Sequence, residues 1–247
     1  KYNTFSLRKI NIKTRLDNKY ESILGALIKN TISHLNVNLT SPDVNLFTCK
    51  FDNQLLIFSH NSLSNEPRWL NRRPRARPFF LPFAIHPKLS RALVNLCRLN
   101  SGQLLLDPFC GTASIGIESC LMNIKFTGID ISKKICYGAQ RNLEYFNLDD
   151  FIIINADSLK LPVSSFDGIV TDFPYGRSSI KNFSDTVEFM TKFFENSSKL
   201  LSSGSFIVYM SPKDWPEFIP SNFSLIDKHE IYIHSNLTRV IRVIRKL

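Results

Sequence analysis

The sequence predicts an α/β protein in which a doubly wound sheet with a C-terminal antiparallel hairpin follows a small α+β domain. Three observations support this prediction. From residue 88 onward, short apolar runs alternate with segments of helical periodicity, which is typical of βαβ units. The run QLLLD at 103–107 is almost entirely apolar and ends in an acid, as expected of a strand buried on both faces. A proline- and arginine-rich stretch at 61–82 separates this region from the residues before it.

The first 60 residues predict the order β-α-β-β. Residues 4–12 are typical of a strand, and residues 19–32 place apolar side chains on one face of a helix. Two strands at 44–51 and 54–59 are expected to form a hairpin. A unit of this size is too small to bury a large core of its own.

The stretch NEPRWLNRRPRARP holds five arginines and three prolines. Proline removes a backbone donor and clashes with the preceding turn of a helix, so we expect no regular helix here. We therefore divide the chain into a small domain at 1–60, a basic linker at 61–82 and a larger domain at 83–247.

In the larger domain the expected elements follow one another in α/β order. The expected helices are 88–99, 114–122, 132–146 and about 185–201. The expected strands are 103–107, 125–130, 152–156, 167–172 and 205–210, with an antiparallel pair from 223–233 and 238–244.

Composition narrows the class of protein. The formal charge of +10 and the pI of about 9.5 favour a polyanionic partner, although a lysine-rich proteome gives the same balance. Five cysteines without a CxxC pair, and five scattered histidines, favour a reducing cytoplasm without disulfides and give no support to a metal site. No apolar run approaches 18 residues, so we expect no membrane association.

The segment LLLDPFCGTASIG at 104–116 predicts a ligand-binding turn between a strand and a helix. Ligands of doubly wound sheets bind at the carboxyl ends of the strands, and Gly111 allows a close approach to the backbone. The turn is neither GxGxxG nor followed by Gly-Lys-Ser/Thr, so a ligand without a pyrophosphate is favoured. The alternative is a turn that only needs a glycine.

Two further acids follow strands. Asp130 ends the second strand about twenty residues beyond the glycine turn, where an acid commonly accepts hydrogen bonds from ribose hydroxyls. The alternative is a helix cap, because either Asp130 or Ser132 could cap the helix that follows. Asp157, in NAD at 155–157, is positioned to accept from an adenine amino group, or is a polar residue in a turn.

The segment IVTDFPYG at 169–176 predicts chemistry on an exocyclic amino group. The lone pair of such a nitrogen is delocalised into the base, and acceptors aimed at its N–H groups make it more nucleophilic. The carboxylate of Asp172 and the main-chain carbonyl of Phe173 are two such acceptors, and Pro174 shapes the turn. Tyr175 is expected to stack on the base, which would have to be extruded from its stack. The alternative is a proline turn that closes a strand.

Together these segments resemble the Rossmann-like, S-adenosylmethionine-dependent methyltransferases. Residues 78–178 resemble the tRNA guanine-N2 methyltransferases, in particular the archaeal enzyme that acts on guanine 10 and its eukaryotic relative. The matching words are RPFFLP, HPKLSRALVNL, LLDPFCGTA, GIDIS, NAD and TDFPYGRSS. Residues 1–60 resemble the later part of a THUMP domain, an RNA-binding module, whose opening portion we expect to be missing.

The resemblance implies a role for each matching residue. It implies a catalytic segment for the target amino group at Asp172, Phe173, Pro174 and Tyr175. It implies cofactor contacts from Asp107, Pro108, Cys110, Gly111, Thr112, Asp130, Ile131, Asp157 and Ser158. The segment 77–96 would help to close the cofactor pocket. We also expect phosphate contacts from Arg68, Arg72, Arg73, Arg75 and Arg77, which position RNA without specifying a base.

The sequence departs from the family pattern at two positions. Phe173 replaces the first proline of the usual pair, and Ala113 stands where glycine is frequent. These departures keep a second hypothesis open, a non-catalytic RNA-binding protein with the same fold. A third hypothesis is methylation of adenine N6 or of another tRNA guanine. We expect a monomeric, cytoplasmic tRNA-binding enzyme, and the eukaryotic relatives imply a small activating partner protein.

Overall fold

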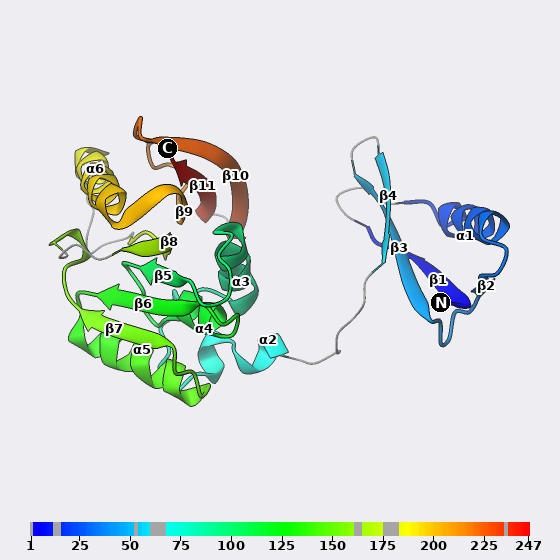
Figure 1. Cartoon of the computed structure of the whole chain (residues 1–247), viewed down its shortest axis with the longest axis horizontal. Coiled ribbons are helices and arrows are strands. Elements are labelled where there is room, and N and C mark those ends of the chain that lie inside the picture. The colour runs from blue at the N-terminus through cyan, green and yellow to red at the C-terminus, as the bar shows by residue number, and fades with distance from the viewer. Residues whose placement is uncertain are drawn as a thin grey trace. The chain divides into compact units, whose positions relative to one another are not determined.

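A computed structural model describes residues 2–11, 16–51, 54–59, 68–160, 165–174, 183–234 and 237–247. The chain forms two compact units, Lys1–Glu66 and Pro67–Leu247 (Figure 1). Within the described residues, no helix is both long enough and apolar enough to cross a membrane.

The first unit is a four-stranded sheet with one helix. Its elements are β1 (Thr4–Lys9), α1 (Lys19–Thr31), β2 (Asn36–Val37), β3 (Val44–Phe51) and β4 (Gln54–Ser59), and the strand order is β2-β1-β3-β4. Strand β1 pairs in parallel with both neighbours, whereas β3 and β4 form the expected hairpin. A small core of Phe5, Leu7, Leu24 and Leu35 joins α1 to the sheet. The two-residue strand β2 was not expected from the sequence.

The second unit is a seven-stranded sheet. Its strands are β5 (Leu104–Asp107), β6 (Lys125–Asp130), β7 (Phe151–Asn155), β8 (Phe166–Asp172), β9 (Leu201–Pro212), β10 (Phe223–His234) and β11 (Leu237–Lys246). Their order is β10-β11-β9-β8-β5-β6-β7. Strands β5 to β9 are parallel, and β11 runs antiparallel to both of its neighbours. The doubly wound sheet with a C-terminal hairpin is thus confirmed. The insertion of β11 between β10 and β9 was not foreseen.

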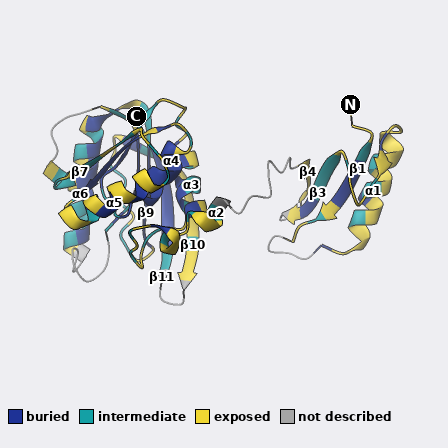
Figure 2. Ribbon diagram, turned by 90° about the horizontal axis from the view of Figure 1, so that it is seen from below, coloured by how far each residue is buried: buried dark blue, intermediate teal, exposed yellow. Residues whose placement is uncertain are grey.

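Helices cover both faces of this sheet. The helices are α3 (Pro87–Leu96), α4 (Ser114–Cys120), α5 (Lys133–Tyr145) and α6 (Phe183–Leu200). Leu105 of β5 packs in a core with residues of α3, α4 and α5, while the next residue, Leu106, packs in a second core with α6. This alternation follows from the two-residue period of a strand. Figure 2 shows the buried residues of the sheet in dark blue and the exposed outer faces of the helices in yellow.

Part of the expected linker is folded onto the second unit. Residues 68–82 contain the one-turn helix α2 (Arg68–Asn71) and the 3₁₀ turn η1 (Pro74–Ala76), which places Pro74 at its start. The amide of buried Asn142 on α5 accepts from the backbone N–H of Phe79 and donates to its carbonyl, each at 2.9 Å. A Cβ on Gly138 would lie 2.1 Å from the ring of Phe79, so the segment packs closely on α5. The prolines therefore shorten the helices of this segment without excluding them.

Candidate active site

A pocket of about 790 Å³ opens at the carboxyl ends of β5, β6, β7 and β8. All nine residues expected to contact a cofactor line it, and so do Asp172, Phe173 and Pro174. Segments separated by up to 67 positions in the sequence therefore meet at one edge of the sheet, as expected for a doubly wound fold. The pocket is also lined by Phe83, Ala84 and Ile85 of the segment 77–96, which is expected to help close it, and by Ser132. Residues that the sequence did not single out line it as well: Phe109, Ser114, Ile115, Ile135, Ala156, Leu159, Asp185, Glu188, Phe189 and Lys192.

The glycine turn after β5 is organised by Asp107. Its Oδ1 accepts from the hydroxyl of Thr171 at 2.7 Å and from the backbone N–H of Phe109 at 3.1 Å. Burial raises the pKa of this carboxyl to about 7, and the Thr171 hydrogen bond opposes that shift. Gly111 has φ +51°, a left-handed conformation that glycine adopts without steric cost. Asp107 therefore ties β5 to β8 and shapes the turn.

Ala113 occupies a second left-handed position in this turn, with φ 59°. A residue with a Cβ costs about 1–2 kcal/mol there relative to glycine. The side chain of Ala113 is completely buried, and burial of one methyl group returns about 0.8 kcal/mol. The alanine is therefore tolerated with little net cost.

Asp130, at the end of β6, faces the pocket but is not the N-cap of the following helix. That cap is Ser132, whose backbone N–H donates to Asp130 Oδ1 at 2.8 Å. Burial raises the pKa of the Asp130 carboxyl, and this bond opposes the shift. Beside it, the side chain of Ile131 is 76% exposed and offers an apolar surface to a ligand.

Asp157 lies on the pocket wall after β7 and also stabilises a local turn. Its Oδ1 accepts from the backbone N–H of Leu159 at 3.1 Å, at the start of the 3₁₀ turn η2 (Ser158–Lys160). Its Oδ2 lies 3.4 Å from the ammonium of Lys160, an exposed pair that contributes little stability. Asp157 therefore lines the pocket, where it can contact a ligand, and also holds the turn that follows β7.

Asp172 ends β8 and forms an ion pair that the sequence did not reveal. Its Oδ2 accepts from Nη1 of Arg239 on β11 at 2.7 Å, and both side chains are largely buried, at 16% and 8% exposed. Its Oδ1 is buried and has no hydrogen-bond partner among the described residues. Burial raises the pKa of Asp172 to about 7, against the opposing effect of Arg239. The carboxylate thus has one oxygen held and one oxygen without a donor.

Phe173, which replaces a proline of the family pattern, is 1% exposed. Its ring lies 4.8 Å from that of Phe193, 4.9 Å from Tyr209 and 5.9 Å from Trp215, between centroids. Its backbone N–H donates to the carbonyl of Met210 at 2.9 Å. Aromatic packing therefore fixes a turn that proline would otherwise stiffen. Tyr175 lies outside the described residues.

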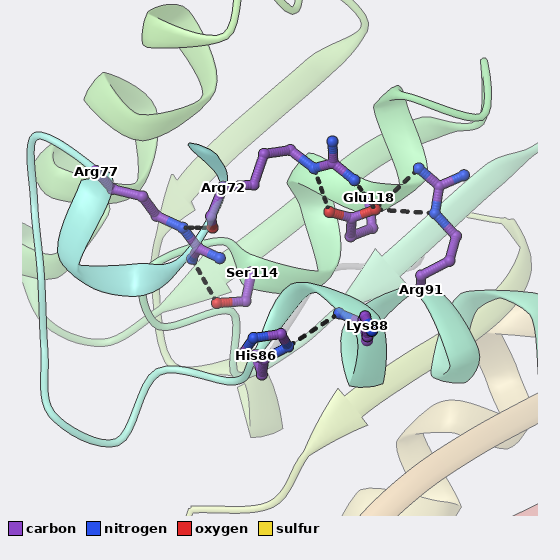
Figure 3. Close-up of polar contacts among 7 residues, drawn as sticks. All are labelled: Arg72, Arg77, His86, Lys88, Arg91, Ser114 and Glu118. Atoms are coloured by element: carbon purple, nitrogen blue, oxygen red, sulfur yellow. Dashed lines mark hydrogen bonds and ion pairs between the residues drawn. The ribbon is translucent and has the colours of Figure 1, made fainter. Parts of the chain in front are cut away.

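Two of the five arginines expected to contact phosphate are committed to the interior of the protein. Arg77 is 5% exposed, and its guanidinium donates to Ser114 at 2.6 Å and to the carbonyl of Arg72 at 3.0 Å. Burial lowers the pKa of Arg77 to about 10, so it stays charged at neutral pH. The Nε of Arg72 donates to Glu118 at 2.7 Å, and Arg91 approaches the same carboxylate from the other side (Figure 3).

The expectation of phosphate contacts is therefore wrong for Arg77 and Arg72. A guanidinium inside the protein must be paired, and the partners here are protein atoms. Arg73 and Arg75 are exposed, and the guanidinium of Arg75 lies 5.9 Å from the ring centroid of Phe80. The side chain of Arg68 lies outside the described residues.

Comparison with known proteins identifies the family. Residues 74–241 match the RMKL-like methyltransferase domain family UPF0020. The chain is 32% identical over 230 residues to the tRNA (guanine(10)-N2)-dimethyltransferase of Methanothermobacter thermautotrophicus, covering 92% of this chain and 68% of that protein. It is also 32% identical over 244 residues to the enzyme of that name from Pyrococcus abyssi, covering 96% of this chain and 72% of that protein.

Among solved structures, TrmN from Thermus thermophilus shares the fold, with a TM-score of 0.61 and 18% identity. The similarity covers 100% of this chain and 73% of TrmN. Because the family match includes the glycine turn and all the strand-end carboxylates of the pocket, the chain belongs to the RMKL-like methyltransferases, within the group that contains the archaeal tRNA (guanine(10)-N2)-dimethyltransferases.

Proposed function

We propose that this enzyme methylates the exocyclic N2 amino group of guanine in tRNA, at guanine 10, with one or two methyl groups. The observation that carries the proposal is the carboxylate of Asp172, which lines the same pocket as the glycine turn and has one oxygen without a donor among the described residues. The names of the relatives from Methanothermobacter thermautotrophicus and Pyrococcus abyssi support the choice of substrate.

The pocket fits S-adenosylmethionine as cofactor. Its volume of about 790 Å³ is in the range of small-molecule sites. In this assignment Asp130 holds the ribose hydroxyls, Ile131 lies against the adenine, and Asp157 faces the adenine amino group. The left-handed Gly111 brings main chain close to the methionine end, near Asp107. When bound, this cofactor supplies an electrophilic methyl group on a sulfonium sulfur, which keeps the bonding electron pair as the methyl leaves.

Asp172 orients the amino group and receives its proton. An N–H of guanine donates to Oδ1, which holds the nitrogen lone pair toward the reacting methyl group, and alignment of this kind is a large part of catalysis. As the new C–N bond forms, one N–H bond breaks and its proton passes to the carboxylate or onward to water. The main-chain carbonyl of Phe173 is the second acceptor in this proposal, and Tyr175 stacks on the base.

The function is tested by methylation of a tRNA transcript with labelled cofactor, followed by nucleoside mass analysis. The expected products are N2-methylguanosine and N2,N2-dimethylguanosine at position 10, and none from a transcript that carries adenine there. Methyladenosine as the product would favour adenine N6 chemistry. Cofactor binding without any transfer would favour the non-catalytic RNA-binding protein. Analysis with and without a cell extract tests the need for an activating partner.

The exposed arginines of the segment 68–82 are proposed to contact tRNA phosphates, together with the THUMP-like first unit. The double variant Arg73→Ala/Arg75→Ala is expected to weaken tRNA binding. Because each phosphate contact releases counterions, the slope of log Kd against log salt concentration should fall by roughly 1.4–1.8 for two lost contacts. Filter binding at KCl concentrations from about 50 to about 300 mM measures the slope.

Arg245→Ala is the matched control, because it removes an exposed arginine from a different element, β11. We expect its slope to equal that of the parent protein. An unchanged slope in the double variant would show that Arg73 and Arg75 do not contact phosphates.

A further inference from the structure

The partner of Asp172 comes from a strand with no part in the expected site. Arg239 is the third residue of β11, which pairs antiparallel with β9, and the register places Arg239 opposite Pro212. Asp172 of β8 pairs with Met210 on the other edge of β9. The guanidinium therefore reaches across the end of β9, where Nη1 lies 4.0 Å from the sulfur of Met210 and 2.7 Å from Asp172 Oδ2.

This ion pair gives the two oxygens of the Asp172 carboxylate different environments. Oδ2 accepts a charge-assisted hydrogen bond, which is stronger and more directional than a neutral one. Oδ1 is buried and has no donor among the described residues, an arrangement that costs free energy unless a ligand supplies a donor. A carboxylate that is anchored through one oxygen presents the other in a fixed direction.

We infer that Arg239 is a positioning residue for the methyl-transfer reaction, which holds Asp172 as an oriented carboxylate whose Oδ1 faces the amino group of the base. The inference rests on the proposed function of Asp172 and extends it to a residue 67 positions later in the sequence. Arg239 itself does not contact the base in this assignment.

Several charged groups surround Asp172. The charge of Asp172 adds to the raised pKa of Asp107 on β5, and Asp130 lines the same pocket. Helix α6 contributes Asp185, Glu188 and Lys192 to the pocket wall. Burial raises the pKa of Asp172, whereas the charge and the hydrogen bond of Arg239 lower it. Removal of Arg239 should therefore raise this pKa further, and activity that needs the carboxylate should require higher pH.

The first experiment is the pH profile of kcat/KM for methyl transfer by the full chain. In the parent protein, activity should rise as the pH passes about 7, as Asp172 loses its proton. Arg239→Met should move this midpoint upward by at least about one pH unit and lower kcat at neutral pH, with a smaller effect on KM. Arg239→Lys keeps the positive charge, so its midpoint should return most of the way to that of the parent protein. A midpoint equal to that of the parent in Arg239→Met would overturn the inference.

Arg242 provides a matched control. It is a second buried arginine of β11, 2% exposed, and its Nη1 donates to the hydroxyl of Ser211 at 2.9 Å. Arg242→Met removes a buried guanidinium from the same strand and leaves the Asp172 pair intact, so the midpoint should not move. A shift of equal size in both variants would assign the effect to the strand and overturn the specific role of Arg239.

The second experiment needs no substrate. Carbon-13 NMR of carboxyl-labelled aspartate, with the Asp172 signal identified by its loss in Asp172→Asn, follows the titration of this group directly. The signal should titrate at higher pH in Arg239→Met than in the parent. Failure of the proposed function would appear as no guanine methylation by the parent protein, whereas failure of this inference would appear as an unchanged titration.

Discussion

Asp172→Asn is expected to lower the rate of methyl transfer to tRNA by about 10²–10⁴-fold, the usual contribution of one acid–base residue. Asparagine has nearly the same shape but cannot accept a proton. Its carbonyl oxygen would be drawn to the Arg239 guanidinium, which leaves the amide NH₂ toward the substrate, where a donor meets another donor. The cofactor contacts assigned to Asp130 and Asp157 are unchanged, so cofactor affinity should change by less than about threefold, under 1 kcal/mol.

Single-turnover transfer of a labelled methyl group measures the rate, and calorimetry measures cofactor affinity. The variant also removes the negative charge that faces Arg239 in a largely buried position, which lowers the free energy of unfolding by up to about 3–5 kcal/mol. The double variant Asp172→Asn/Arg239→Met removes both charges and serves as the folded control. If the double variant binds cofactor, unfolds near the parent temperature and still transfers methyl at the parent rate, Asp172 has no catalytic role.

Glu118→Gln is expected to lower the free energy of unfolding by about 3–5 kcal/mol, because it removes a buried negative charge that faces two arginines. The carboxylate of Glu118 is 1% exposed, and Arg72 and Arg91 are 12% and 25% exposed. Together these residues join the segment before α3, helix α3 itself and helix α4, which begins directly after the glycine turn (Figure 3). Urea denaturation followed by circular dichroism measures the loss.

Glu230→Gln is the matched control for this prediction. It also breaks an ion pair, at 2.8 Å from Lys213, but both side chains are about half exposed, so the change should stay within about 0.5 kcal/mol. A second variant, Glu118→Met with Arg72→Met and Arg91→Met, replaces the whole cluster by apolar side chains and should recover most of the stability. If Glu118→Gln loses no more than Glu230→Gln, the cluster does not hold these elements together.

Local sequence was sufficient for the parts of the site that follow strands. The acids at 107, 130 and 172 each end an apolar run, and parallel strands bring such ends to one edge. The Asp172–Arg239 pair was not predictable in this way, because it depends on which strand lies beside β9. The segment LTRVIRVIRK does carry a signal, since an arginine among core-type residues of a strand must find a partner.

The arginines of the segment 68–82 show what composition alone cannot predict. Composition counts charges but does not say which way a guanidinium points, so Arg72 and Arg77 were counted with the surface residues Arg73 and Arg75. Their hydrogen-bond partners both belong to α4. Glu118 lies 46 positions after Arg72, and Ser114 lies 37 positions after Arg77. A long-range ion pair of this kind has no periodicity in sequence.

The position of Arg239 on β11 has a consequence for biosynthesis. A ribosome adds Asp172 to the nascent chain 67 residues before it adds Arg239. Until β11 inserts between β10 and β9, a growing chain contains every strand-end carboxylate of the pocket but lacks the cation that faces one of them. Catalytic competence should therefore arise only when β11 is in place, and chains that terminate before residue 239 should be inactive.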